Sequence, residues 1–351
     1  MKNLGFKLLA LSLAFILLSS LDGYAGGRSR AGTNAASELL IPVGARYIAM
    51  GGASVSTAAG IDAIHWNPAG LSRMTNSAGA MFSHMTYIAG IDLEYVAVAA
   101  NFSGLGTLGI TFKSLAFGDI AITTEDSPDG TGGLYSPNFF TFGLTYSRLL
   151  SDRISVGATM NLVSEKLDRV SGSAIAFNAG VQYTDLGNVP GLSIGVAMKN
   201  VGTTMKYSGT GLLRQGQLQD ISRGPSFYNV VASTNELPST IELGVGYSRS
   251  FGESGKLNLS SLFQNNNYDD DEIKVGAEYA FKDIIFLRGG WQLAPDAPND
   301  AVGAENSYVF GPSFGGGFHY DLGGIDFTLD YAWRDVNFFD ANNVFTVRLG
   351  F

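Results

Sequence analysis

The stretch IDFTLDYAW, residues 325–333, places an apolar side chain at every second position. Residues 343–351, NVFTVRLGF, repeat this rule, and residues 273–281, IKVGAEYAF, follow it as well. A period of two puts alternate side chains on opposite faces of a β-strand, whereas a helix would repeat every 3.6 residues. These stretches are therefore predicted to be strands with one apolar face.

The alternation continues through most of the chain after residue 76. Most of the alternating segments have ten to fourteen residues, whereas a membrane strand needs about 9–11 and soluble strands average about 5–6. Their length favours strands that cross a lipid bilayer. We count fourteen segments, near residues 77–90, 92–103, 106–117, 139–150, 154–167, 172–185, 192–207, 239–251, 256–267, 272–282, 284–294, 312–322, 325–334 and 343–351.

The connections between these segments differ systematically in length. Alternate links are tight, as at 103–106 and 151–153. The links between them include three long ones, at 118–138, 208–238 and 294–311. All the long loops are therefore expected on one side of the sheet, which is typical of outer-membrane barrels. The even strand count returns the first and last strands to the same side.

A soluble β-sandwich is the main alternative, because its strands also alternate. However, the less apolar face here is mostly Gly, Ala, Ser and Thr, which is too plain for a solvated surface. Aromatic residues gather toward the segment ends, as in interfacial girdles: Tyr146, Phe251, Phe281, Trp291, Tyr320 and Trp333. We predict an all-β fold, a 14-stranded antiparallel transmembrane β-barrel over residues 77–351.

The composition excludes several other classes of protein. Charged residues are only 15% of the 351, against roughly 25% in soluble domains. With 45% hydrophobic residues the chain is too apolar for disorder. It has no cysteine, so disulfides and thiolate sites are excluded. A net charge of −9 with only 22 Lys and Arg argues against nucleic-acid binding.

The first 25 residues are predicted to be a cleaved signal peptide. Lys2 and Lys7 precede or border the apolar run 8–18, and Gly23-Tyr24-Ala25 supplies the small residues of a cleavage site. As a membrane anchor, eleven apolar residues would cover only about 17 Å of a hydrocarbon core about 30 Å thick. The predicted location is therefore the bacterial outer membrane.

Residues 26–76 are too rich in Gly and Ala for a separate core. Fourteen strands spaced about 4.8 Å apart and tilted about 40° give a barrel about 28 Å across, too wide for small inward side chains to fill. We therefore expect residues 26–76 to lie inside the barrel as an N-terminal plug, or hatch.

The plug contains three motifs: Gly44-Ala45-Arg46, Met50-Gly51-Gly52-Ala53 and Trp66-Asn67-Pro68-Ala69-Gly70-Leu71. Their order and spacing resemble the N-terminal signature of the PorV/PorQ family, which is related to the FadL-like outer-membrane barrels. Members of that family commonly carry an acidic pair before the Trp-Asn-Pro stretch, where this chain has only Asp62.

The resemblance implies a role accessory to type IX protein secretion. PorV-like proteins act as outer-membrane partners of the secretion translocon and dock cargo through its C-terminal domain. The alternative is FadL-like passive uptake of hydrophobic small molecules through the lumen. The last segment, with Phe345, Val347, Leu349 and a terminal Phe351, resembles the signal that the barrel assembly machinery reads before insertion into outer-membrane lipid.

Charged residues on the inward face are the candidate lumen site. Lys274 and Glu278 share one face of a strand, and Asp326, Asp330 and Arg348 should project inward from the last two strands. Hairpin pairing is expected to bring Asp330 near Arg348. We interpret these charges as ion pairs that stabilise the barrel or anchor the plug, with a transport path as the alternative.

No motif indicates catalysis, a metal or a cofactor. The G-x-G-x-x-G pattern at 104–109 bridges two strands, so it is predicted to be a hairpin turn. His65, His84 and His319 lie in no metal or nucleophile pattern, and the chain is predicted not to be an enzyme. The acidic run 269–272 lacks EF-hand spacing and is interpreted as a solvated loop rather than a Ca²⁺ site.

Overall fold

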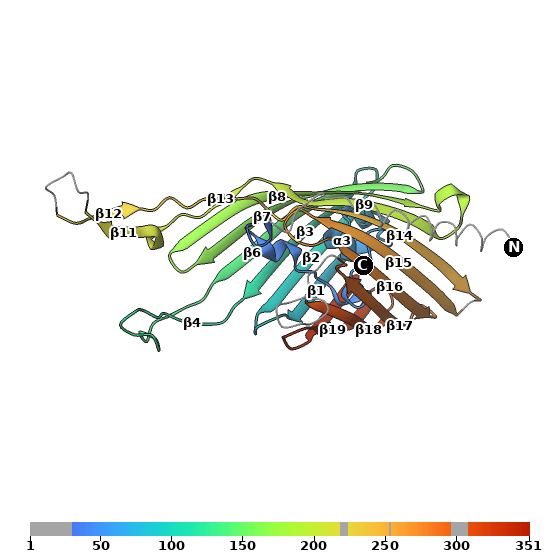
Figure 1. Ribbon diagram of the computed structural model, residues 1–351. Helices are drawn as coiled ribbons and strands as arrows, with labels where there is room; N and C mark the ends of the chain where they lie inside the picture. The colour runs from blue at the N-terminus through green and yellow to red at the C-terminus, as the bar shows by residue number, and fades with distance from the viewer. Residues whose placement is uncertain (1–29, 218–223, 253, 296–307) are drawn as a thin grey trace.

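The computed structural model describes residues 30–217, 224–252, 254–295 and 308–351, and its strands form one closed barrel (Figure 1). The predicted signal peptide lies outside the described residues. Among the described residues, no helix is long and apolar enough to cross a membrane.

The barrel contains fourteen antiparallel strands, each paired with its neighbours around the ring. In order around the barrel they are β1 (Ala78–Thr86), β2 (Asp92–Phe102), β3 (Gly106–Ala116), β6 (Asn138–Leu149), β7 (Ile154–Leu167), β8 (Val170–Thr184), β9 (Leu192–Gly202), β14 (Thr240–Phe251), β15 (Gly255–Asn266), β16 (Glu272–Phe281), β17 (Ile285–Leu293), β18 (Phe310–Asp321), β19 (Asp326–Val336) and β20 (Asn342–Gly350).

Pairing of β1 with β20 closes the ring, with the Ala78 amide donating to the Phe351 carbonyl at 3.1 Å. The predicted fold class is therefore confirmed, and the sandwich alternative is wrong. Two predicted segments end earlier than expected: the first stops at Thr86 and the seventh at Gly202. Asn200 has a left-handed backbone (φ 58°), and the β8–β9 pairing changes register between Phe177 and Ala179 beside it. The pairing ends at Gly202, and residues 205 and 206 pair with residues 235 and 234 instead.

The two ends of the barrel differ, and we name them by their connections. At the short-turn end lie tight links such as 103–105, the start of β1 and the end of β20. The long-loop end carries the connections 117–137, 203–239 and 294–309. Small hairpins lie in the first two of these loops (Figure 1): β4 (Ile120–Ala121) with β5 (Leu134–Tyr135), β10 (Met205–Lys206) with β13 (Thr234–Asn235), and β11 (Leu213–Gly216) with β12 (Ser226–Asn229).

The outward faces of the strands form an apolar outer wall. Phe82, Val96, Phe112 and Phe142 are paired in a row across four adjacent strands, and all four are exposed. Their sequence neighbours at 83, 97, 111 and 143 are buried or small and face inward. The exposed row is the surface expected to meet lipid.

Residues 30–76, which we call the lumenal segment, lie against the inward faces of the strands (Figure 1). The segment starts at the long-loop end, where Arg30 contacts Glu236 and Tyr268. It finishes at the short-turn end, where Asn76 contacts Asp326. Its short helices are η2 (Ser37–Leu40), α2 (Ala45–Ile48), η3 (Gly60–Asp62), α3 (Ala63–Trp66) and η4 (Pro68–Arg73).

Inward glycines let the lumenal segment approach the wall closely. A Cβ at Gly180 would overlap the amide oxygen of Asn67, and one at Gly290 would overlap the backbone of Met50 and Gly51. The main hydrophobic core fills the interface between segment and wall, joining residues such as Tyr47 and Trp66 to Met81 and Leu93. Packing this close leaves no room for larger side chains at these glycine positions.

Gly290→Ala should destabilise the barrel by about 1–3 kcal/mol, because the added methyl group must displace the Met50–Gly51 backbone. Urea unfolding in lipid vesicles measures the effect. The matched control is the adjacent Gly289→Ala, whose Cβ would face outward and meet Phe314 at an ordinary 3.6 Å. Equal stability of the two variants would contradict the close approach.

Candidate functional site

The Gly44–Gly52 stretch forms a compact turn that aims Arg46 at the wall. Gly44 has φ 84°, and a Cβ there would approach the Met81 side chain at 2.9 Å. The Ala45 amide donates to Thr346 Oγ1 at 2.9 Å, and the Gly51 amide to Ser313 Oγ at 3.0 Å. These two bonds attach opposite ends of helix α2 to β20 and β18.

The Trp66–Leu71 stretch holds the segment together and to the wall. The Trp66 indole donates to the Val43 carbonyl at 3.2 Å. The Asn67 side chain accepts from the Ala69 amide at 3.1 Å, capping η4, and donates to the Val55 carbonyl at 2.7 Å. An Asn at this position satisfies a free helix donor and a buried carbonyl at once.

Six alternating charges form a continuous chain in the short-turn half of the lumen, and we call it the ion-pair chain. Glu278 accepts from Arg46 at 2.9 and 3.0 Å and from Arg288 at 2.6 Å. Asp330 then accepts from Arg288 at 2.6 Å and from Arg348 at 2.7 Å. Arg348 also donates to Asp62 at 2.6 Å.

The ends of the ion-pair chain are on the lumenal segment and its middle is on the wall. Arg46 and Asp62 belong to the segment, whereas the other four residues come from β16, β17, β19 and β20. Arg288 and Asp330 have fully buried side chains, with 0% exposure. Three arginines balance three carboxylates, and buried charges need such pairing to offset their loss of hydration.

The structure places the predicted lumen residues in different surroundings. Glu278, Asp330 and Arg348 lie in the ion-pair chain, with Asp330 beside Arg348. Lys274 shares the face of Glu278 but pairs with Glu272 at 2.7 Å. Asp326 lies at the short-turn end and accepts from the Asn76 amide at 2.6 Å.

Arg288 was not among the residues expected in the lumen, and the pairing of Arg46 with Glu278 was not expected. Arg288 lies on the inward face, between outward Leu287 and Gly289, so alternation could have placed it in the lumen. Hairpin pairing across the tight link 282–284 places Arg288 opposite Glu278, whereas its contact with Asp330 joins strands that are not neighbours. At the last strand, Phe345, Val347 and Leu349 lie on the outward face, and Phe351 is exposed at the end.

The histidines do not assemble with an acid and a hydroxyl in catalytic geometry. His84 contacts Glu94 at 2.7 Å on the outer wall. The His319 ring is 3.1 Å from Thr328 Oγ1 but 3.7 Å from Asp326, beyond a hydrogen bond. Among the described residues, no cluster of His, Asp and Glu could hold a metal ion. The predicted turn at 104–109 joins β2 to β3.

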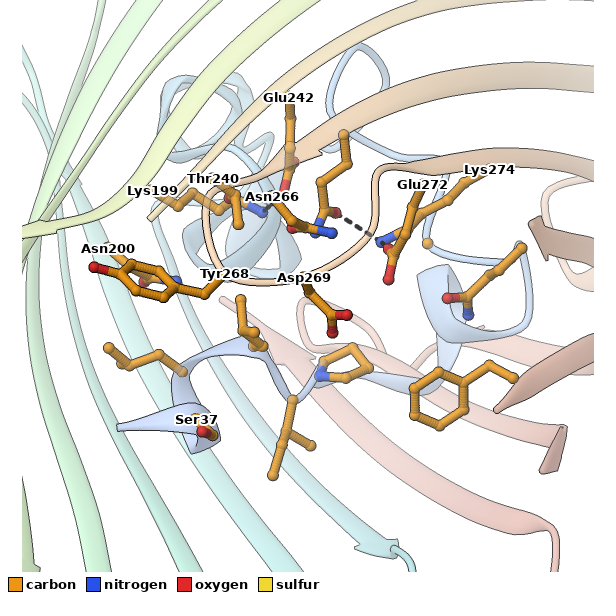
Figure 2. Close-up of a pocket in the computed structure, with 18 of the residues that line it drawn as sticks. Ser37, Lys199, Asn200, Thr240, Glu242, Asn266, Tyr268, Asp269, Glu272 and Lys274 are labelled. Atoms are coloured by element: carbon orange, nitrogen blue, oxygen red, sulfur yellow. Dashed lines mark hydrogen bonds and ion pairs between the residues drawn. The ribbon is translucent and has the colours of Figure 1, made fainter. Parts of the chain in front are cut away.

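A cavity of about 370 Å³ opens at the long-loop end between the lumenal segment and the wall (Figure 2). We call it the outer cup. Figure 2 shows Lys199 beside Glu242 on one flank and Lys274 beside Glu272 on another, and these pairs are 2.8 and 2.7 Å long. Amides such as Asn266 lie between them. The wall of the cup therefore combines ion pairs and amides with apolar side chains such as Leu39, Ile41 and Phe310.

His65 contributes to the floor of the cup, packing edge-on against Trp66. Burial, followed by the positive charges of Lys113, Lys199 and Lys274, holds the pKa of the His65 imidazole well below its usual range. The ring is therefore neutral at physiological pH, and the charge of the floor does not change there.

Glu38 in η2 is a buried titratable group that should make the stability of the folded lumenal segment depend on pH. It is 3% exposed, and one of its carboxylate oxygens has no partner. Burial and then the negative charge of Glu165 raise its pKa from 4.5 to about 8, against the opposing charge of Lys113. The folded segment therefore binds this proton more tightly than the unfolded chain does.

Stability from Glu38 protonation should be complete below pH 4.5 and lost as pH rises to about 8. The urea midpoint should fall between pH 5 and pH 7, and Glu38→Gln should flatten this slope because a neutral amide does not titrate. Glu125→Gln in an exposed loop is the control. A slope that survives in Glu38→Gln would count against the assignment.

Asp330→Asn should destabilise the barrel by about 3–5 kcal/mol, because it leaves Arg288 and Arg348 short of a buried counter-charge. Urea unfolding in vesicles measures the loss, and trypsin cleavage reports release of the lumenal segment. The control is Glu236→Gln, which breaks the exposed ion pair with Arg30 and should leave stability near wild type. Equal effects of the two changes would contradict a structural role for the ion-pair chain.

The apolar outer wall and the closed antiparallel ring with an N-terminal segment in its lumen define a transmembrane β-barrel. The toluene transporter TodX of P. putida is similar, with 13% identity and a TM-score of 0.55 over 88% of this chain and 99% of TodX. The toluene transporter TbuX of Ralstonia pickettii has 14% identity and a TM-score of 0.51, over 88% and 98% of the two chains. At such identities the likeness concerns the fold alone.

Residues 25–260 match the family described as type IX secretion system protein PorV. The chain therefore belongs to the PorV family, and the resemblance to PorV/PorQ proteins is confirmed. None of the curated proteins compared with the chain matches it. Fold and family together point to the bacterial outer membrane.

Proposed function

We propose that this chain is an accessory barrel of type IX secretion, which binds the translocon or the C-terminal domain of cargo through its long-loop end. The observation that carries the proposal is that a PorV-family barrel has its lumen occupied by a firmly anchored segment. In such a barrel the exposed surfaces, rather than a passage, are available for function. The lumenal segment acts as a plug.

The anchoring of the lumenal segment supports this role. An uptake path along the barrel axis would require breaking contacts of Arg46 and Asp62 with buried wall charges. Breaking buried pairs without replacement costs several kcal/mol. A docking barrel needs no such movement, because its lumen stays closed throughout.

The loops at the long-loop end offer apolar groups to a partner. In the β11–β12 region, Phe227 and Val231 are each 72% exposed, with Val230 beside them. Figure 1 shows this hairpin extending well beyond the barrel. Exposed apolar groups of this kind often mark protein-binding surfaces. Cargo or translocon surfaces with an apolar patch are suitable partners.

Passive uptake of hydrophobic small molecules is the second candidate, favoured by the fold shared with the toluene transporters TodX and TbuX. The charged flanks of the outer cup weigh against it, because apolar ligands bind in pockets lined mainly by hydrophobic side chains. Toluene or decane that entered the cup and protected the barrel from unfolding would favour uptake.

Purification of the tagged chain from solubilised outer membranes should recover a much larger barrel protein or secreted cargo. The double variant Phe227→Ser and Val231→Ser should reduce recovery by about tenfold, the effect of losing two buried apolar anchors. Leu322→Ser, exposed in a tight link at the short-turn end, is the matched control. A chain that is recovered alone, with its fold intact, would contradict the docking role.

A further inference from the structure

Arg334 on β19 is a buried cation in unusual surroundings. Its residue exposure is 1%, and it lines the outer cup. Its Nε and one terminal nitrogen donate to Asn342 Oδ1 at 3.1 and 2.6 Å. Its guanidinium carbon lies 3.9 Å from the centre of the Phe310 ring. The partners of Arg334 are thus a neutral amide and an aromatic face.

Within the described parts of the chain, no carboxylate lies within 4.0 Å of Arg334. Arg288 and Lys199, in contrast, each have a carboxylate at hydrogen-bond distance. A buried charge without a counter-ion is costly, and proteins normally pair it. Glu242, Glu272 and Asp269 also line the cup, so its charged groups are equal in number, but no described carboxylate directly contacts the Arg334 guanidinium.

The amide beside Arg334 supplies a second, independent observation. Asn342 is fully buried, and its Nδ2 has no hydrogen-bond partner. Because Asn342 Oδ1 accepts from Arg334, the free Nδ2 and the guanidinium are donors on adjacent groups. Buried donors are rarely left without an acceptor. What this corner lacks is an anionic acceptor.

We propose that Arg334, held in place by Asn342, forms a carboxylate-binding subsite in the outer cup. The guanidinium recognises the carboxylate by charge and by its N–H groups, and the Asn342 oxygen fixes the orientation of the guanidinium. The rest of the cup, with its Lys–Glu pairs and amides, accommodates the polar remainder of the ligand. The ligand is thus a small polar carboxylate, either free or as an acidic side chain of a peptide.

The ion pairs of the cup distinguish this ligand from a fatty acid. An alkyl chain long enough to fill the cup would cover the Lys199–Glu242 and Lys274–Glu272 pairs as well as the apolar side chains, and would remove water from those charges without replacing it. A short carboxylate leaves those pairs hydrated. The subsite does not depend on a secretion role, since a barrel without a protein partner would bind the same group.

The test uses the whole barrel in lipid nanodiscs and isothermal titration calorimetry with three probes. Succinate represents a free carboxylate, N-acetylaspartate amide an acidic peptide residue, and decanoate a fatty acid. The wild type should bind at least one of the first two and bind it more tightly than decanoate. Preference for N-acetylaspartate amide identifies a peptide as the source, and preference for succinate identifies a free acid.

Asn342→Asp places a carboxylate of the same shape against Arg334 and should occupy the subsite from within. Affinity for the preferred probe should fall by roughly tenfold or more, the loss of a charge-assisted contact. The unfolding midpoint should rise, because Arg334 gains a counter-charge. The matched control is the adjacent outward-facing Asn343→Asp, which makes the same charge change outside the lumen and should leave affinity unchanged.

Arg334→Gln should also abolish probe binding, and Asn342→Asp keeps the test decisive if Arg334→Gln does not fold. Three results would overturn the proposal. They are no binding of either polar probe by the wild type at millimolar concentration, undiminished binding by Asn342→Asp, and tighter binding of decanoate than of both polar probes.

Discussion

The buried ion-pair chain is the interaction that joins the two parts of this molecule. Its terminal charges, on Arg46 and Asp62, belong to the lumenal segment, and its central charges belong to four strands of the wall. None of these groups could be buried alone without a large loss of hydration. The segment therefore balances the charge of the barrel interior, and the barrel in turn positions the segment.

The small inward residues of the wall also depend on the presence of the lumenal segment. A fourteen-strand ring is wider than its own side chains can fill, so another part of the chain must occupy the centre. Glycines such as Gly180 and Gly290 allow backbone to lie against backbone there. Their cost in strand stability is offset by the packing they permit. The same residues that make the inner face look plain in the sequence are thus part of a dense core.

The polarity of the lumen changes along the barrel axis. In the short-turn half, charges are balanced among themselves in the ion-pair chain. Toward the long-loop end the outer cup stays open, and Arg334 lies there with a neutral partner. The short-turn half of the lumen is therefore filled by mutually paired charges, whereas the long-loop half contains an open cavity. This division is compatible with a PorV-family barrel that keeps its lumen closed and presents its long-loop end to partners.

The sequence by itself determined the strands, their number, the two faces and the grouping of the long loops, because these follow from a local period of two and from spacing along the chain. It also indicated that Asp330 and Arg348 face inward. Only the tertiary structure decided that Lys274 pairs with Glu272 rather than Glu278, that Arg288 links Glu278 to Asp330, and that the lumenal segment starts at the long-loop end. The Arg288–Asp330 and Arg30–Glu236 contacts join residues 42 and 206 positions apart. They depend on how the strands close the ring around the lumenal segment, which no local pattern encodes.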